Sequence, residues 1–579
     1  MKKSFSLLVV GVLIFGVVTI PCISSLNLED VVITQEMHTP PVVKIKIIPY
    51  STVYEGDIID CNITGEPTFK YWQINDKDEH TIFHEDDPLI IDPEPTPLKD
   101  EFVNLTVYAE NEYGNDSDTV PIELKRIFFG DIHWHTPISD GNYDIDTMYT
   151  NAIKDNYLDF AACSDHAELI DGINTFYMGI PRFGGVPWWD FIKTIFDKIR
   201  GYSEWQTMKD KATEYNDPGN FTTLLGFEWT AAQWSPGGRK WTAHGWEDVG
   251  HINFYYKDVY PDAREYSDLQ KFNYDSIFRA MADEWDKGHL NIGFPHHPQG
   301  KASWVSFTTN WTFLANGMSN TDDRNKVLRG VETYSRWGTA IGQYYTPEVP
   351  WLWPYKEDQF YNQTDAWVEN ALWEWSENTM KGRRFVFIAG SDTHDYDRPG
   401  SALFEESHLA GPSGIVAVYA VHNTREEIWD AMNNCSVYAL QLLKIRANAR
   451  FDGQMAYGRW INCSSPLEIQ ITACYTFSGV DHSGKSMCPH GYSPSELSYP
   501  ISDIWLVKKD SGKERPWCKV IGHVSPYENI TVVTFEDSDV KPNDFYWIVI
   551  KQEGEMLSPN NNEYMAFLGP VFINNVTTS

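Results

Sequence analysis

Two histidines in the segment 130–136, GDIHWHT, have the spacing of paired metal ligands. In an extended strand, residues i and i+2 point to the same face, so His133 and His135 can reach one metal ion together. Neutral imidazole is a common ligand in zinc and iron sites. By itself an HxH pair is a weak signal, and two structural histidines would be the simpler interpretation if nothing accompanied it.

Further histidines and carboxylates accompany this pair, most of them at the ends of apolar segments. Glu228 could bridge two cations, and Asp392 and His394 repeat the i, i+2 spacing. Independent strands would rarely all end in potential ligands by chance, so the pattern predicts a metal site. The candidate ligands are His133, His135, Asp140, His166, Glu228, His251, His296, Asp392 and His394.

Strand-like and helix-like segments alternate between Phe128 and about Leu440. Apolar segments such as LDFAACSDH and RRFVFIAGSDTH alternate with amphipathic segments such as YDSIFRAMADEWDKG. This alternation predicts a βα architecture with parallel strands, in which active-site groups lie at the carboxyl ends of the strands. Most candidates stand at such ends, whereas His251 opens the segment HINFYY. Glu332, in RGVETYS, could face the same site.

The motifs GDIHWHTPISDG, CSDH, GFEW, PHHP and GSDTH, in this order, resemble those of the PHP superfamily, named for polymerase and histidinol phosphatase domains. More closely, they resemble its branch of exported phosphoesterases with GDxHxHT and GSDTH motifs. The resemblance covers about residues 128–440. It implies a distorted (β/α)7 barrel that holds up to three metal ions, commonly zinc, manganese or iron.

The resemblance also gives the first five candidates a role. His133 and His135 match the opening ligand pair, and Asp140 matches the aspartate of the SDG motif. His166 matches the histidine of the second motif, and Glu228 matches the bridging glutamate.

The remaining candidates match the later motifs. His251 and His296 match the histidines of the third region, where His244 competes with the first and His297 with the second. The aspartate and histidine of GSDTH match the closing ligand pair.

Such a site implies hydrolysis by activated water. Cations that lie close together lower the pKa of a bridging water, and the hydroxide would attack phosphorus in line with the leaving oxygen. A nearby arginine would neutralise charge on the phosphoryl oxygens. Arg398, four residues past His394, is the favoured arginine, although a surface salt bridge is its plainer role. His244 and His297 are candidate acids for the leaving group.

The charge balance argues against a nucleic-acid partner. The chain has 46 Lys and Arg against 81 Asp and Glu, which gives a net charge of −35. Affinity for nucleic acid depends largely on cationic side chains that neutralise phosphates, so a surface this acidic disfavours it. Hydrophobic residues make up 42% of the 579 residues, which is enough for packed cores.

The N-terminus has the pattern of a secretory signal. Lys2 and Lys3 precede an apolar run from Leu7 to Ile23, and two serines follow. The run is near the lower limit for a membrane span, so retention as an anchor is the alternative. Ten N-x-[ST] sequons agree with a glycosylated protein. We therefore expect the protein to be secreted or to lie on the outer face of the cell membrane.

Changes in the residue pattern along the sequence predict β domains on both sides of the central region. Cys61 and Trp72 resemble the core pair of an immunoglobulin-like sandwich, although the partner cysteine expected near Tyr108 is absent. After about Lys444 strand-like segments dominate again. The predicted segments are 1–25, signal or anchor; 26–39, linker; 40–126, Ig-like β-sandwich; 127–443, PHP-like metallohydrolase barrel; and 444–579, C-terminal β-sandwich.

These observations favour an exported metal-dependent hydrolase, a phosphoesterase with two or three divalent metal ions and a small-molecule or glycan-linked phosphoester as substrate. The first alternative is a metallohydrolase that cleaves an amide, lactone or carboxylic ester. The second is a cell-surface binding protein with a non-catalytic barrel. The full ligand set argues against the second, because a scaffold does not need every ligand.

Overall fold

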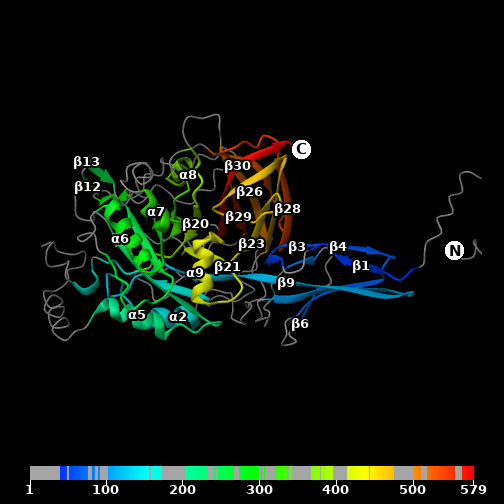
Figure 1. Ribbon diagram of the computed structural model, residues 1–579, viewed down its shortest axis with the longest axis horizontal. Coiled ribbons are helices and arrows are strands. Elements are labelled where there is room, and N and C mark those ends of the chain that lie inside the picture. The colour runs from blue at the N-terminus through cyan, green and yellow to red at the C-terminus, as the bar shows by residue number, and fades with distance from the viewer. Residues whose placement is uncertain are drawn as a thin grey trace, which may run out of the picture.

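The computed structural model describes residues 39–578 with internal gaps, of which the longest are 92–101, 173–202, 231–238, 307–320, 342–366, 395–413, 475–499, 510–517 and 554–563. The expected signal or anchor lies outside the described residues. Within them, no helix combines the length and apolarity needed to cross a membrane. The fold is mixed α/β, with many strands and few helices, as Figure 1 shows.

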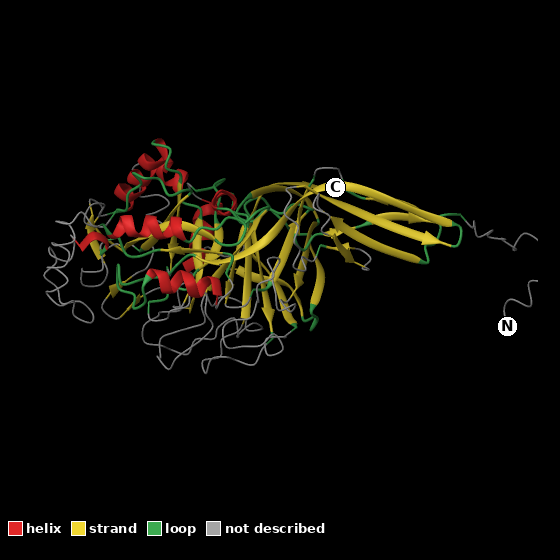
Figure 2. Ribbon diagram, turned by 90° about the horizontal axis from the view of Figure 1, so that it is seen from below, coloured by secondary structure: helices red, strands yellow, loops and turns green. Residues whose placement is uncertain are grey.

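The N-terminal strands share an apolar core of their own. In one sheet β6, β5, β8 and β9 pair antiparallel in that order, and β2 pairs in parallel with β9. Cys61 and Trp72 both lie in this core. Figure 2 shows these strands extending as an arm from the rest of the molecule. The strands are β1 Val42–Ile45, β2 Thr52–Tyr54, β3 Ile58–Ile59, β4 Cys61–Thr64, β5 Phe69–Asn75, β6 Thr81–His84, β7 Leu89–Ile90, β8 Phe102–Asn111 and β9 Gly114–Asp131.

Strand β9 connects this arm to the centre of the molecule. Its first part pairs with β8, where burial alternates from residue to residue, as in a strand with one exposed face. Its last six residues, from Arg126 to Asp131, are all buried. The domain boundary expected between residues 126 and 127 therefore falls inside one continuous strand. His133 and His135 follow directly after the end of β9 and are buried.

The central strands meet in the order β15, β14, β11, β10, β9. β10 pairs in parallel with β9 and with β11, as predicted. β14 is antiparallel to both neighbours, so the prediction of parallel strands is wrong there. The bounds are β10 Phe160–Cys163, β11 Thr222–Thr230, β14 His251–Tyr256 and β15 Asn291–His296.

A smaller sheet adjoins both ends of this row. β18, Gly330–Ser335, pairs in parallel with β20, Val386–Ala389, and antiparallel with the two-residue β19, Gly338–Thr339. A parallel bridge joins Gly293 of β15 to Leu328, just before β18. Another joins Trp134, just after β9, to Thr393 beyond β20. Two hairpins complete the strands of this region: β12 Arg239–Thr242 with β13 Gly245–Asp248, and β16 Lys301–Ala302 with β17 Val305–Ser306.

The prediction of helices from amphipathic segments is confirmed at three of them, DTMYTNAIKDN, YDSIFRAMADEWDKG and TREEIWDAMNN. Asn273 caps the first turn of one of them, α6, by accepting from the backbone N–H of Ser276, and the Ser276 hydroxyl accepts from the Asn273 N–H. Thr424 caps α9 in the same way by accepting from Glu427 N–H. The helical elements are α2 Ile145–Lys154, the short 3₁₀ turn Ile170–Gly172, α5 Glu204–Glu214, α6 Tyr274–Asp286, α7 Thr321–Val327, α8 Trp367–Glu377 and α9 Arg425–Asn433.

The C-terminal strands continue the central sheet and add a second one, and their buried residues join the same core. β21 pairs antiparallel with β9 and with β22, so the prediction of parallel strands is wrong there too. β30, β29, β26 and β27 follow β22 in this order, with β24 also beside β30. The second sheet has the order β23, β25, β28. The bounds are β21 Gly414–Ala420, β22 Val437–Gln441, β23 Arg446–Phe451, β24 Trp460–Ser465, β25 Leu467–Cys474, β26 Ile501–Lys509, β27 Cys518–Val524, β28 Ile530–Asp537, β29 Phe545–Gln552 and β30 Tyr564–Thr578.

Buried ion pairs hold the arm against the second C-terminal sheet. Glu55 pairs with Arg446, and Asp57 pairs with Arg450, both arginines being on β23. The two carboxylates are 1% and 4% exposed, respectively. Replacing either arginine alone would leave a buried carboxylate without its charged partner, which is costly away from water. The arm is therefore fixed to the molecule by charge as well as by β9.

Candidate metal centre

Glu228, near the end of β11, lies at the middle of the candidate ligands and is fully buried. Its Oε1 is 2.6 Å from His251 Nδ1 and 3.4 Å from His296 Nε2. Its Oε2 is 3.3 Å from both His133 Nε2 and His135 Nε2. Oε1 is also 3.1 Å from His166 Nδ1. The two oxygens therefore face two different sets of histidines, as a carboxylate between two cations would.

The reversed strand β14 explains how His251 reaches this group. His251 is the first residue of its strand, whereas His296 is the last residue of β15. Because the two strands are antiparallel, His251 and His296 stand opposite each other in the ladder. The first residue of a reversed strand lies at the same edge as the last residue of its neighbour. One edge of the sheet therefore carries both histidines.

Asp392 closes the inner part of the group from the segment after β20. Its Oδ1 is 3.3 Å from His133 Nε2 and 3.1 Å from His135 Nε2. The N–H of Asp392 donates to the His133 carbonyl at 2.6 Å, and the His135 N–H donates to the Thr393 carbonyl at 3.0 Å. These backbone bonds hold the HxH and GSDTH segments side by side, although they lie far apart in the sequence.

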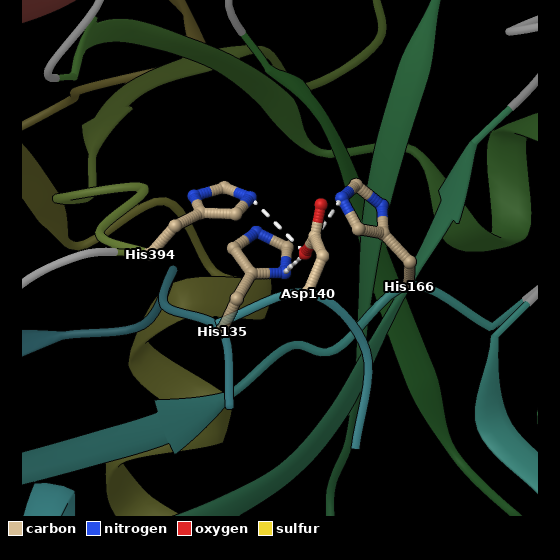
Figure 3. Close-up of side chains that lie close together, drawn as sticks. All are labelled: His135, Asp140, His166 and His394. Carbon is tan, nitrogen blue, oxygen red and sulfur yellow. Dashed lines mark ion pairs between the residues drawn. The ribbon is translucent and has the colours of Figure 1, made fainter. Parts of the chain in front are cut away.

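A more exposed set of ligands lies beside the inner one. Figure 3 shows its four side chains, His135, Asp140, His166 and His394. Asp140 Oδ1 is 3.3 Å from His394 Nε2, 3.6 Å from His166 Nε2 and 4.0 Å from His135 Nδ1. The side chain of Asp140 is 41% exposed and that of His394 is 18% exposed. The inner ligands are at most 3% exposed. This outer set is therefore the part of the group that solvent can reach.

A buried carboxylate that sequence reasoning left without a role holds the loop of Asp140. Asp165 accepts from the N–H of Thr136 at 2.7 Å, from its hydroxyl at 2.6 Å and from the hydroxyl of Ser139. These three bonds fix the turn that leads from His135 to Asp140. Its place beside His166 in the CSDH motif is the signal that could have identified it.

The electrostatics of the inner group favour the protonation states that metal binding needs at Glu228 and His296. They oppose them at two other histidines, because nearby carboxylates outweigh burial and raise the pKa of both His133 and His135, so a metal ion bound there would displace a proton. Burial opposes ionisation of Glu228, but His166, His296 and His251 outweigh it and hold the pKa of this carboxyl well below its usual range. Burial, only partly offset by Glu228, lowers the pKa of His296 to about 3. Metal ligands must be deprotonated, so an ionised carboxylate and a neutral imidazole are the required forms.

Four overlapping sets of these side chains could each hold a metal ion, and within each set the ligand atoms lie within 4.8 Å of one another. The donor types fit divalent transition metals, which imidazole and carboxylate bind well. His135 Nε2 is buried and makes no hydrogen bond, although two carboxylates lie close to it. The sets are His135, Asp140, His166 and His394; His133, His296 and Asp392; His133, His135 and Glu228; and Glu228, His251 and His296.

The structure thus brings all nine candidate ligands into one group. Arg398, His244 and His297, the candidates for direct roles in catalysis, lie outside the described residues. Their roles, and the competition of His244 with His251 and of His297 with His296, stay predictions.

Gly390 allows β20 to approach the HxH segment closely. A Cβ added at Gly390 would lie 2.4 Å from Cβ of His133 and 3.2 Å from Oε2 of Glu332, both of which are buried. Gly390→Ala is therefore expected to displace His133, weaken metal binding and lower the free energy of unfolding by about 1–3 kcal/mol. Calorimetric titration with Mn²⁺ and denaturant unfolding measure the two effects.

Gly382→Ala is the control for that variant. Gly382 has φ of +83° and nothing within 4 Å of an added Cβ, so the change strains the backbone by about 1–2 kcal/mol without touching the ligands. It should lower stability and leave the affinity for Mn²⁺ unchanged. Equal affinity in Gly390→Ala and the wild type would contradict the role given to Gly390.

Comparisons with known proteins place the chain near one uncharacterised family. It matches the family described as "Protein of unknown function (DUF3604)" over residues 191–296 and 355–454, which is less than half of the chain. No curated protein matches the chain.

Solved structures give only remote likenesses. The chain is similar to a two-domain protein from Bacteroides vulgatus containing a predicted PHP-like metal-dependent phosphoesterase, with 12% identity, coverage of 77% of this chain and 95% of that one, and a TM-score of 0.31. It is also similar to a β-glucuronidase from Parabacteroides merdae, with 9% identity, coverage of 90% and 63%, and a TM-score of 0.15. TM-scores this low do not establish a shared fold, so any function must follow from the site's own side chains.

Proposed function

We propose that this protein is an exported metal-dependent phosphoesterase of the PHP type, with the nine grouped residues as ligands for two or three zinc, manganese or iron ions. The position of Glu228 carries the proposal, because its two buried oxygens face separate sets of histidines. Divalent ions bound here would lower the pKa of a water molecule and neutralise charge on a phosphoryl group.

The strand order supports a distorted seven-stranded barrel around this site. β9, β10, β11, β14 and β15 form one row, and bridges connect its ends to β18 and β20. In barrels of this kind, catalytic side chains lie at one end of the strands. The ligands at or just beyond the ends of β9, β11, β15 and β20, and at the start of the reversed β14, share such an end.

The difference in exposure between the two parts of the site supports a direction of substrate approach. Asp140 and His394 are partly exposed, whereas Glu228 is fully buried. A phosphoester would therefore enter over the outer set, with its phosphoryl group toward Glu228. The chain as a whole carries a net charge of −35, which favours a small-molecule or glycan-linked phosphoester over a nucleic acid. Export, with the N-terminal segment cleaved or kept as an anchor, is part of the proposal.

Purified protein is expected to contain two or three transition-metal ions per chain, since the ligands outnumber those of one tetrahedral site. Elemental analysis before and after reconstitution with Mn²⁺, Zn²⁺ and Fe²⁺ measures this number. The reconstituted protein should hydrolyse p-nitrophenyl phosphate monoesters or diesters, and a chelator should remove the activity.

Carboxylic ester, lactone and amide analogues belong in the same assay. Hydrolysis of these analogues alone would assign the protein to the wider class of metallohydrolases and would leave the proposal of a metal centre unchanged. Protein that binds no metal under any of these conditions would refute the metal centre itself.

A further inference from the structure

A second buried carboxylate lies on the far side of the His133 ring. Glu332 Oε2 is 2.7 Å from His133 Nδ1, and Glu332 is 2% exposed. The other ring nitrogen, His133 Nε2, faces Glu228 and Asp392 at 3.3 Å each. The ring therefore lies between two carboxylates that belong to the ligand group and a third that does not.

An irregularity in β18 accompanies this contact. The pairing of β18 with β20 shifts register between Glu332 and Tyr334, which leaves Thr333 as an extra residue. A bulge of this kind changes the direction of nearby side chains and is common beside active sites. Glu332 thus reaches a residue 199 positions earlier in the chain, and its neighbours in the strand stay buried.

The contact fixes which nitrogen of His133 is free for a metal ion. A neutral imidazole carries one proton, and the nearer carboxylate at Nδ1 keeps it there, so that the lone pair lies on Nε2. We infer that Glu332 is a positioning residue, which holds the ring and the tautomer of His133 for the metal ion beside Glu228 and Asp392. This inference rests on the proposed metal centre, and it does not depend on the substrate.

Glu332 acts through His133 and not as a ligand. Among the described residues, none of the four sets that could hold a metal ion includes Glu332. An acceptor behind a metal-bound histidine typically contributes about 10–100-fold in metal affinity or activity. Removing Glu332 should therefore weaken the inner site and leave the outer set of Asp140, His166 and His394 nearly unchanged, because these residues do not contact it.

The test is the binding of Co²⁺ to the full-length, metal-free protein, measured by calorimetry and by visible absorption. Glu332→Ala is expected to weaken one class of Co²⁺ sites about 10–100-fold and to change the absorption of that class. Glu332→Gln should recover part of the loss, because its amide oxygen can still accept from Nδ1–H. Glu284→Gln is the matched control: Glu284 is also fully buried and lies 2.8 Å from a histidine ring, that of His289, outside the site.

The outcomes separate this inference from the proposed function. If the wild type binds Co²⁺ and Glu332→Ala, folded by its melting curve, binds with the same affinity and spectrum, the inference is wrong and the metal centre stands. An equal loss in Glu332→Gln and Glu332→Ala would also overturn it, because the hydrogen bond would then have no part. If the wild type binds no metal, both this inference and the proposed metal centre are wrong. Metal binding without phosphoesterase activity would refute the substrate class alone.

Discussion

Glu228→Gln is expected to lower hydrolytic activity by more than about 100-fold, beyond the usual effect of a residue behind a ligand. Glutamine has nearly the same shape but no charge. Both inner sites would therefore lose the negative charge of the carboxylate that they share. Both oxygens of Glu228 lie within 3.4 Å of histidine nitrogens. The metal content should therefore fall to at most one ion per chain, held by the outer set.

Elemental analysis of the purified variant tests this directly, with activity measured on the same sample. Glu427→Gln serves as the control, because Glu427 Oε1 lies 2.6 Å from His422 Nδ1, outside the site. It should keep full metal content and activity. A Glu228→Gln protein with the metal content of the wild type would show that Glu228 does not join two metal sites.

The sequence predicted the nine grouped residues because each one belongs to a short local pattern. The i, i+2 spacing of His133 and His135 needs only the geometry of an extended chain, and the structure places both rings against Glu228. Asp392 and His394 repeat that spacing, and Asp392 reaches the same ring nitrogens. The grouping of several such patterns followed from the expectation that strand ends meet at one edge.

The direction of β14 could not be predicted in this way. Alternation of apolar residues shows that a segment is a strand but does not show which way it runs. His251 was among the candidates and lies beside Glu228 in the structure, although its position at the start of a strand conflicted with an all-parallel arrangement. The antiparallel ladder with β15 removes the conflict, because it sets His251 opposite His296.

The supporting contacts themselves were beyond local patterns. The sequence predicted that Glu332 could face the site, but it did not predict the contact with His133, which crosses 199 residues and lies beside a bulge. The CSDH motif points to Asp165, but its hydrogen bonds to Thr136 and Ser139 depend on a turn formed elsewhere in the chain. Residues that bind the metal share a recognisable chemistry, whereas residues that support them are defined by tertiary contacts.

Replacement of Asp392 is expected to separate the chemical role of this residue from its backbone role. Asp392 has φ of 53°, in the left-handed region that few residues other than glycine adopt easily. Such a conformation is strained, and it persists only where surrounding contacts hold it. Here the contact is the hydrogen bond that the Asp392 N–H donates to the His133 carbonyl. Asp392→Asn, Asp392→Gly and Asp392→Ala all remove the charge, so each should lose more than about 100-fold in activity.

The stabilities of these variants should differ although their activities do not. Glycine adopts φ of 53° without strain and asparagine tolerates it, whereas alanine meets a cost of about 1–2 kcal/mol. In the metal-free state, Asp392→Ala should therefore unfold about 1 kcal/mol more easily than Asp392→Gly, as measured by denaturant titration. At Asp140, which has no positive φ, the order should reverse, because alanine restricts the unfolded chain more than glycine does. The same order of stability of the alanine and glycine variants at both positions would mean that the backbone at Asp392 is not strained. Full activity in Asp392→Asn would show that Asp392 has no part in the site.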